Sequence, residues 1–240
     1  MLKNMWLLLA LIWPCAAQQP PAGENRIVSG TLAGDDGNLI SGGFVTLRYQ
    51  RIVPPGRLMR PLSRPTEHTT RSGSDGAFRF DNLLYGNYVL CAQVPRSSWL
   101  NSCDWGSNPI QVSVSEAPSA TVTVVMRKGA AIPIRIDDPT RSLSQDQGRT
   151  PGAHLLLGVG GTDGLFRPAV FVSEDGGGRN YQTLVPFDLA IKMVASSSFF
   201  QMADGLGTPL QAQTTAIPLT VPARSTPPGI RFIVTGRRVQ

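Results

Sequence analysis

Residues 72–92 read SGSDGAFRFDNLLYGNYVLCA, and this stretch is the most informative about the fold. Asp75 and Gly76 accept the positive φ that a tight hairpin turn requires. After this turn, large apolar residues alternate with polar ones, which is typical of strands buried on one face. The residues that share the apolar faces are Phe78, Phe80, Tyr88, Leu90 and Ala92. The stretch therefore predicts two short β-strands between turns.

Short alternating runs continue on both sides of this stretch. The runs expected to form strands cover residues 26–32, 43–51, 77–80, 88–94, 110–114 and 121–127. The chain of 240 residues contains 25 Gly and 20 Pro. Such frequent turn residues divide a chain into short elements, which favours strands over helices. We expect an all-β, antiparallel β-sandwich over residues 26–127.

Residues 26–127 also resemble a known family, the carboxypeptidase regulatory-like domain. The positions that match its pattern are Gly30, Thr31, Asp36, Gly42, Asp75, Gly76, Phe78, Phe80, Leu83, Gly86, Tyr88 and Leu90. Phe44 stands where the family often has a smaller residue. The resemblance implies a prealbumin-like (transthyretin-like) sandwich and a non-catalytic structural or binding module. It is specific for the fold and uninformative about the ligand.

The second half of the chain shows a weaker version of the same pattern. Residues 128–150 are expected to form a linker, with a candidate first strand of the next unit at residues 131–136. Residues 151–240 are expected to form a second β-sandwich-like domain, so that two sandwiches lie in tandem. In this reading Asp175-Gly176 corresponds to Asp75-Gly76.

The first residues have the layout of a secretory signal peptide. A positive Lys3 precedes the apolar run of residues 5–13, and Cys15-Ala16-Ala17 follows, so we expect residues 1–17 to be removed. Lipid attachment at Cys15 is the alternative, although Trp13 and Pro14 precede it where small residues are usual. Residues 18–25 form a polar, Pro-rich segment ahead of the first domain. We expect a secreted or periplasmic protein without a transmembrane helix, because the apolar run is shorter than the ~20 residues that a spanning helix needs.

Cleavage after Ala17 leaves two cysteines, Cys91 and Cys103. An even pair in an exported chain predicts a disulfide bond. A CxxC-type redox or metal site does not fit their spacing.

Residue patterns for catalysis or metal binding are missing from the sequence. His68 and His154 are the only histidines, and no zinc-ligand spacing surrounds them. No G-x-S-x-G motif and no phosphate-binding loop occurs. Asp137-Asp138 and Glu174-Asp175 are adjacent acid pairs, whose side chains should point to opposite faces of a strand. We therefore expect neither an enzyme nor a cofactor.

Two groups of residues are candidates for binding. The net charge of +6 comes mainly from arginine. Arg57, Arg60 and Arg64 lie in a Pro/Arg segment that could bind carboxylate, sulfate or phosphate groups, or could simply be a solvated loop. Trp99 and Trp105 flank Cys103 and could contact a sugar or a protein, or could cap the sandwich core.

Two functions are compatible with these features. One is a non-catalytic exported structural or protein-interaction module of the bacterial cell envelope. The alternative is a carbohydrate-binding module, since the resembled fold is similar to starch-binding-like sandwiches. The expected partner is an envelope protein or a glycan, and no feature predicts nucleic-acid binding.

Overall fold

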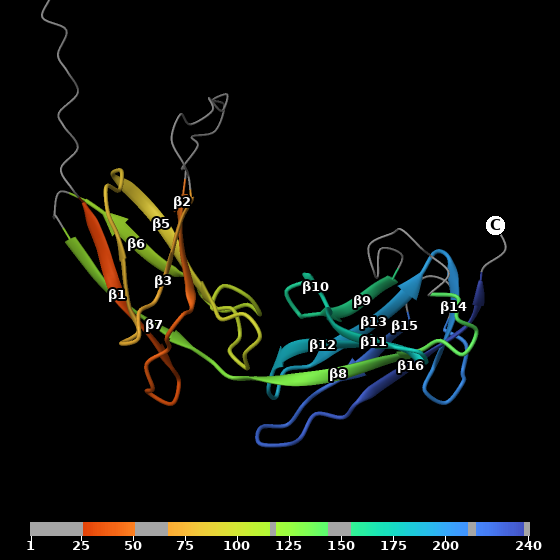
Figure 1. Cartoon of the computed structure of the whole chain (residues 1–240). Helices are drawn as coiled ribbons and strands as arrows, with labels where there is room; N and C mark the ends of the chain where they lie inside the picture. Colours follow the sequence, from red (N-terminus) through yellow and green to blue (C-terminus); the bar gives the residue numbers. More distant parts are fainter. Residues whose placement is uncertain (1–25, 51–66, 116–118, 144–154, 211–214, 238–240) are drawn as a thin grey trace, which may run out of the picture.

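The computed structural model describes residues 26–50, 67–115, 119–143, 155–210 and 215–237. In these residues every regular element is a β-strand, so the predicted all-β fold is confirmed. Figure 1 shows the strands gathered into two β-sandwiches that follow one another along the chain. None of the described segments forms a helix that is long and apolar enough to cross a membrane.

The first sandwich has a four-stranded and a three-stranded sheet. The larger sheet has the order β3 (Glu67–Arg71), β2 (Phe44–Gln50), β5 (Gly86–Gln93) and β6 (Ile110–Val114). The smaller sheet has the order β4 (Ala77–Phe80), β1 (Ile27–Gly34) and β7 (Ser119–Met126). Neighbouring strands are antiparallel except for β1 and β7, which pair in parallel.

The core of the first sandwich is formed by the residues whose alternation predicted it. Phe78, Phe80, Tyr88, Leu90 and Ala92 are all buried. The preceding turn is also present, because Gly76 has a φ of 69° and the Asp75 carboxylate accepts a hydrogen bond from the Ala77 N–H at 3.0 Å. In β4 and β5, side-chain alternation thus assigns the buried face correctly.

The second sandwich has a five-stranded and a four-stranded sheet. The larger sheet has the order β11 (Val170–Asp175), β12 (Gly178–Pro186), β8 (Gly129–Asp137), β16 (Ile230–Arg237) and β14 (Phe200–Asp204). The smaller sheet has the order β10 (Phe166–Pro168), β9 (Leu155–Gly160), β13 (Ile191–Ser197) and β15 (Thr215–Leu219). Its core includes Ile132, Ile134, Ile136, Met193 and Phe232.

The two sandwiches share one feature of topology. In the first, β1 pairs in parallel with β7 and antiparallel with β4, the strand that follows Asp75-Gly76. In the second, β8 pairs in parallel with β16 and antiparallel with β12, the strand that follows Asp175-Gly176. The internal repeat itself stays a prediction.

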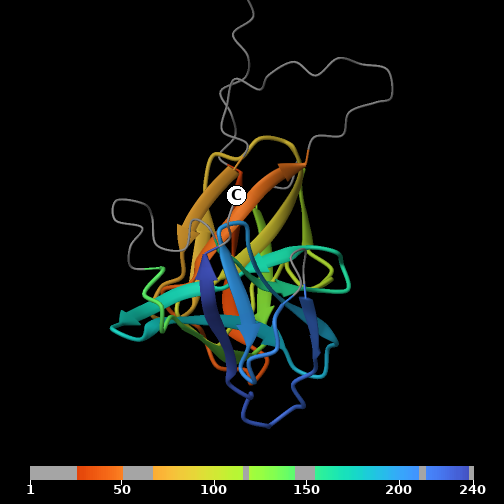
Figure 2. The ribbon, with the colours of Figure 1, turned by 90° about the vertical axis from the view of Figure 1, so that its right-hand side faces the viewer.

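The connection between the sandwiches is short. Strand β7 ends at Met126 and β8 begins at Gly129, so only Arg127 and Lys128 lie between them. Strand β8 covers the run expected at residues 131–136 and is the middle strand of the larger second sheet. Figure 2 is viewed nearly along the line that joins the sandwiches and shows the second one in front of the first.

Candidate functional site

The predicted binding residues fall into two groups in the structure. Arg57, Arg60 and Arg64 lie outside the described residues. Cys91 in β5 and Cys103 form the predicted disulfide bond, with a Cα–Cα distance of 5.4 Å. The disulfide closes part of the loop of residues 94–109, which connects β5 to β6 and carries both tryptophans.

Trp99 packs against the core of the first sandwich. Its ring lies so close to Gly34 that a Cβ atom there would overlap it. The Lys128 ammonium lies 5.0 Å from the ring centroid and 2.8 Å from Oδ2 of Asp36. The acidic turn at Asp35 and Asp36 is thus occupied by a lysine, which holds the pKa of Asp36 down at about 2. Among the described residues no group of His, Cys, Asp or Glu has the geometry to hold a metal ion.

Trp105 instead packs against the core of the second sandwich. The Arg167 guanidinium carbon lies 4.1 Å from the centre of its ring. The same guanidinium forms a two-armed ion pair with Asp163, at 2.6 and 3.1 Å, which holds the pKa of Asp163 at about 2. Each indole therefore packs against a sandwich core and a basic side chain, Trp99 in the first sandwich and Trp105 in the second, as the core-capping alternative expected. The role in ligand binding predicted for Trp99 and Trp105 stays a prediction.

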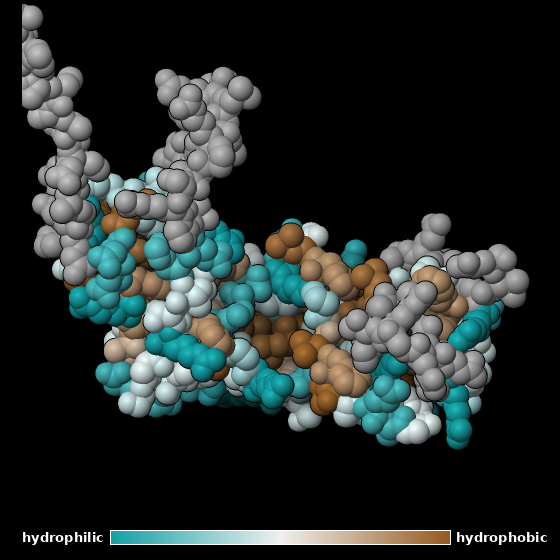
Figure 3. All heavy atoms as spheres, turned by 45° about the horizontal axis from the view of Figure 1, so that its top comes forward, coloured by the Kyte–Doolittle hydropathy of each residue, from teal (hydrophilic) through white to brown (hydrophobic). Residues whose placement is uncertain are grey.

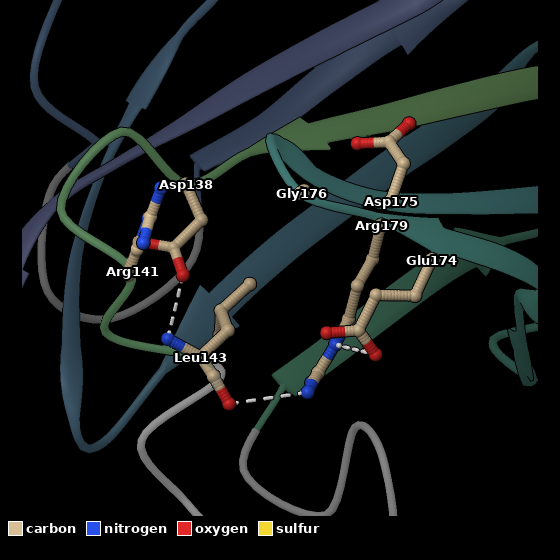
Figure 4. A pocket seen from close by; sticks show the side chains of 8 residues that line it. Asp138, Arg141, Leu143, Glu174, Asp175, Gly176 and Arg179 are labelled. Carbon is tan, nitrogen blue, oxygen red and sulfur yellow. Dashed lines mark hydrogen bonds and ion pairs between the residues drawn. The ribbon is translucent and has the colours of Figure 1, made fainter.

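Glu174 and Asp175 are adjacent in β11 and point to opposite faces, as strand geometry requires. Glu174 accepts a bond from Nε of Arg179 at 3.3 Å, whereas Asp175 receives both terminal nitrogens of Arg135 at 2.6 and 2.7 Å. Figure 4 shows these two carboxylates on opposite sides of their strand. Arg135 holds the pKa of Asp175 at about 2, so this carboxylate is ionised at neutral pH.

The other acid pair is engaged in a similar way. Burial disfavours the ionised form of Asp137, but hydrogen bonds from Arg231 and Arg135 outweigh it and lower its pKa. Asp138 accepts the backbone N–H groups of Ser142 at 2.9 Å and Leu143 at 2.7 Å. Asp138 is therefore a turn-forming residue.

Two hollows flank β11, the edge strand of the five-stranded sheet. The first, of about 300 Å³, lies at the β11–β12 turn and is lined by Asp138, Arg141, Leu143, Glu174, Asp175, Gly176, Gly178 and Arg179. In it the Arg179 guanidinium bonds Glu174 and the Leu143 carbonyl oxygen (Figure 4). The second hollow, of about 530 Å³, lies over β8 and β12 and includes the polar residues Ser173, Asn180, Gln182, Arg135 and Arg231.

The most exposed apolar strand of the second sandwich is β11 itself. Val170, Phe171 and Val172 are 67%, 41% and 57% exposed. Leu165 and Phe166, at 58% and 39%, extend this apolar surface onto β10. Figure 3 shows hydrophobic side chains in the middle of the molecule, where β9, β10 and β11 lie in Figure 1. We call residues 165–175 the β10–β11 edge.

The β10–β11 edge is open among the described residues. Strand β11 pairs only with β12, and β10 pairs only with β9, so the outer backbone groups of both have no strand partner there. Pro168 in β10 and the acidic residues Glu174 and Asp175 in β11 are features that discourage strand pairing. The part of this edge without such features is Val170, Phe171 and Val172.

The sequence pattern did not predict a binding edge at residues 165–175. The local signal is the run Val170-Phe171-Val172, which Ser173 separates from the acids Glu174 and Asp175. An acid pair alone does not mark an edge, because the central strand β8 also ends next to two acids, Asp137 and Asp138. The exposure of the three apolar side chains depends on the order of strands in the sheet, and the sequence of apolar and polar residues does not specify that order.

Comparisons with known proteins are remote. No model of a known protein family matches the chain, and no curated protein does. The resemblance to the carboxypeptidase regulatory-like domain therefore stays a prediction.

Among solved structures, a streptococcal ancillary pilin is similar over 91% of this chain, with 15% identity and a TM-score of 0.39, and the chain spans 64% of that pilin. The shaft pilin SpaA of Lactobacillus rhamnosus GG is similar over 88% of this chain and 98% of its own, with 12% identity and a TM-score of 0.32. A putative carbohydrate-binding protein of Pseudomonas aeruginosa is similar over 44% of this chain and 89% of its own, with 14% identity and a TM-score of 0.26.

Proposed function

We propose that this protein is a non-catalytic, exported structural module of the bacterial cell envelope that binds another protein through the β10–β11 edge. The observation that carries the proposal is an edge strand with open backbone groups and three consecutive exposed apolar side chains. Such a surface is costly to leave in water and is a template for another strand.

Binding by strand addition accounts for both features of the edge. An extended partner segment would pair with the outer N–H and C=O groups of β11, and each main-chain hydrogen bond contributes about 0.5–1.5 kcal/mol net. Its side chains would cover Val170 and Phe171, which removes apolar surface from water. The register shift between Phe171 and Ser173 limits the length of regular pairing, so a short segment fits best.

The two sides of the edge also specify the chemistry of the partner. On one side lie the exposed rings of Phe171 and Phe166. On the other lies the larger hollow, whose lining is mainly apolar and includes the polar side chains of Asn180, Gln182 and Arg231. Since successive side chains of a strand point to opposite faces, a partner segment with alternating apolar and polar residues is complementary to this edge.

The non-catalytic part of the proposal is supported by the state of the acidic groups. Asp175, Asp137 and Glu174 are each paired with arginine, and Asp138 is bound to backbone N–H groups. A general acid or base needs a carboxyl group that can exchange a proton near neutral pH. Lowered pKa values at Asp175 and Asp137 work against that role.

Export is supported by the disulfide between Cys91 and Cys103, because such bonds persist in oxidising compartments. The signal peptide over residues 1–17 lies outside the described residues and remains a sequence-based prediction.

Site-specific photocross-linking tests the docking edge. A photoreactive residue at Val172 should form a covalent adduct with one protein of an envelope extract. The double variant Val170→Lys/Phe171→Lys should reduce this adduct strongly, because two charges would have to be buried. A photoreactive residue at Val125, which is 54% exposed on β7, is the matched control. Equal adducts from positions 125 and 172, or none from 172, would contradict the proposal.

A further inference from the structure

We infer that the loop of residues 94–109 is a brace that fixes the angle between the two sandwiches, with Trp105 as its contact with the second one. We call this segment the brace loop. The inference does not depend on partner binding at the β10–β11 edge, although Arg167 belongs to that edge, and it concerns the stiffness of the whole chain.

Two sandwiches joined only by a covalent connection would be expected to move relative to each other. Here the residues on either side of Lys128 are hydrogen-bonded to the brace loop. The Leu100 N–H donates to the Arg127 carbonyl oxygen at 2.9 Å, and the Gly129 N–H donates to the Ser98 carbonyl oxygen at 2.8 Å. These bonds pair the brace loop with the connection like a short antiparallel ladder, centred on Trp99 and Lys128.

Close packing at Gly129 strengthens this ladder. Gly129 is the first residue of β8 and is buried. A Cβ atom there would lie 2.7 Å from Cδ2 of Leu100 in the brace loop and 2.7 Å from the Val185 carbonyl oxygen in β12. The absence of a side chain therefore lets both sandwiches approach the connection closely.

Trp105 makes the contact with the second sandwich. Its indole packs on the second core and lies under Arg167, 4.1 Å from the guanidinium carbon. Arg167 has a side chain only 14% exposed and is held in place by Asp163. A Cβ atom on Gly161 would lie 3.4 Å from the indole, so the ring lies close to this glycine of the second sandwich. A cation–π contact of this kind stabilises the interface in addition to the apolar area that the ring buries.

The disulfide ties the other end of the brace to the first sandwich. Cys103 lies two positions before Trp105 and is bonded to Cys91 in β5. Ser102 adds two hydrogen bonds to Ala92, one through its N–H at 3.0 Å and one accepted by its hydroxyl at 2.8 Å. Because β5 is a central strand of its sheet, the position of Trp105 is fixed relative to the first sandwich. The disulfide and the Ser102 hydrogen bonds thus hold Trp105 rigidly where it contacts the second sandwich.

Distance measurements between the sandwiches test the brace. Spin labels attached through non-natural amino acids at Thr69 and Lys192, both exposed, report one distance across the joint without new cysteines. The full mature chain should give a narrow distribution. Trp105→Ala, and separately Cys91→Ala/Cys103→Ala, should each widen it roughly twofold, as expected for sandwiches that are free to move.

Tyr85→Ala is the matched control, because Tyr85 is an aromatic residue 50% exposed that also carries a cation–π partner, Arg26, but lies away from the joint. Its distribution should keep the wild-type width. If Trp105→Ala fails to fold, as judged by circular dichroism, Arg167→Gln and reduction of the wild-type disulfide with dithiothreitol give the same test. Unchanged widths in the folded variants would overturn the inference. Widening on loss of the disulfide but not of Trp105 would overturn the role assigned to that residue.

Discussion

Single residues at the joint show how little free space the first sandwich has. Gly34 ends β1, and a Cβ atom there would overlap the Trp99 ring and lie 2.6 Å from Oδ1 of Asp36. We expect Gly34→Ala to lower the free energy of unfolding by about 1–3 kcal/mol, the usual cost of overpacking. Gly160→Ala is the control, since no atom lies within 4 Å of a Cβ there. Urea denaturation measures both, and equal stability of the two variants would contradict the expectation.

Charged residues on β8 and β11 predict a specific response to acid. The folded pKa of Asp175 is about 2, below its ordinary 3.8, because Arg135 binds the ionised form. Its contribution to stability is therefore complete above about pH 4 and is lost as the pH falls toward 2. Thermal unfolding of the wild type should show a steeper fall in Tm between pH 4 and pH 2 than Asp175→Asn. Identical slopes would argue against this pair as a source of acid sensitivity.

At the scale of elements, β8 and β11 are opposites within one sheet. Strand β8 is central and buries Ile132, Ile134 and Ile136 on its inner face, whereas β11 is an edge and every residue in it is exposed. Ile134→Ala should cost about 2–5 kcal/mol, because it removes buried methyl groups and leaves a cavity. Val170→Ala should change stability by no more than about 0.5 kcal/mol.

Chemical denaturation of these two variants checks the comparison. A large loss from Val170→Ala would mean that β11 is covered in the isolated chain, which would also remove the support for the docking edge.

At the scale of the whole molecule, the two sandwiches form one elongated chain whose joint is held from the first sandwich (Figure 1). The brace loop contacts the connection through backbone bonds and the second core through Trp105. If the brace loop fixes the angle between the sandwiches, the two keep one relative orientation, which suits the structural role that we propose.

The export of the whole molecule has its own test. N-terminal sequencing of the protein from its native host should begin at Gln18, because the small residues at Cys15-Ala16-Ala17 match the site that signal peptidase reads. A retained Met1, or a lipid on Cys15, would show that the interpretation of the first residues was wrong.

The sequence by itself determined the local features of this protein. Alternation identified the strands and their buried faces, as at Phe78, Phe80 and Tyr88, because the period of two is a property of each strand alone. Asp75-Gly76 identified a turn, because the backbone conformation there depends on those residues. The disulfide followed from counting cysteines in a chain that is predicted to be exported.

Tertiary structure alone decided which strands became neighbours and which became edges. The parallel pairs β1–β7 and β8–β16 join the first and last strands of each sandwich, and no local pattern encodes such distant partners. The contact of Trp105 with the second sandwich was also decided by the tertiary structure, because nothing in the sequence places that sandwich against it. Likewise, Val170 and Val172 have the composition of a buried strand, and they are exposed because β11 is at the end of the strand order.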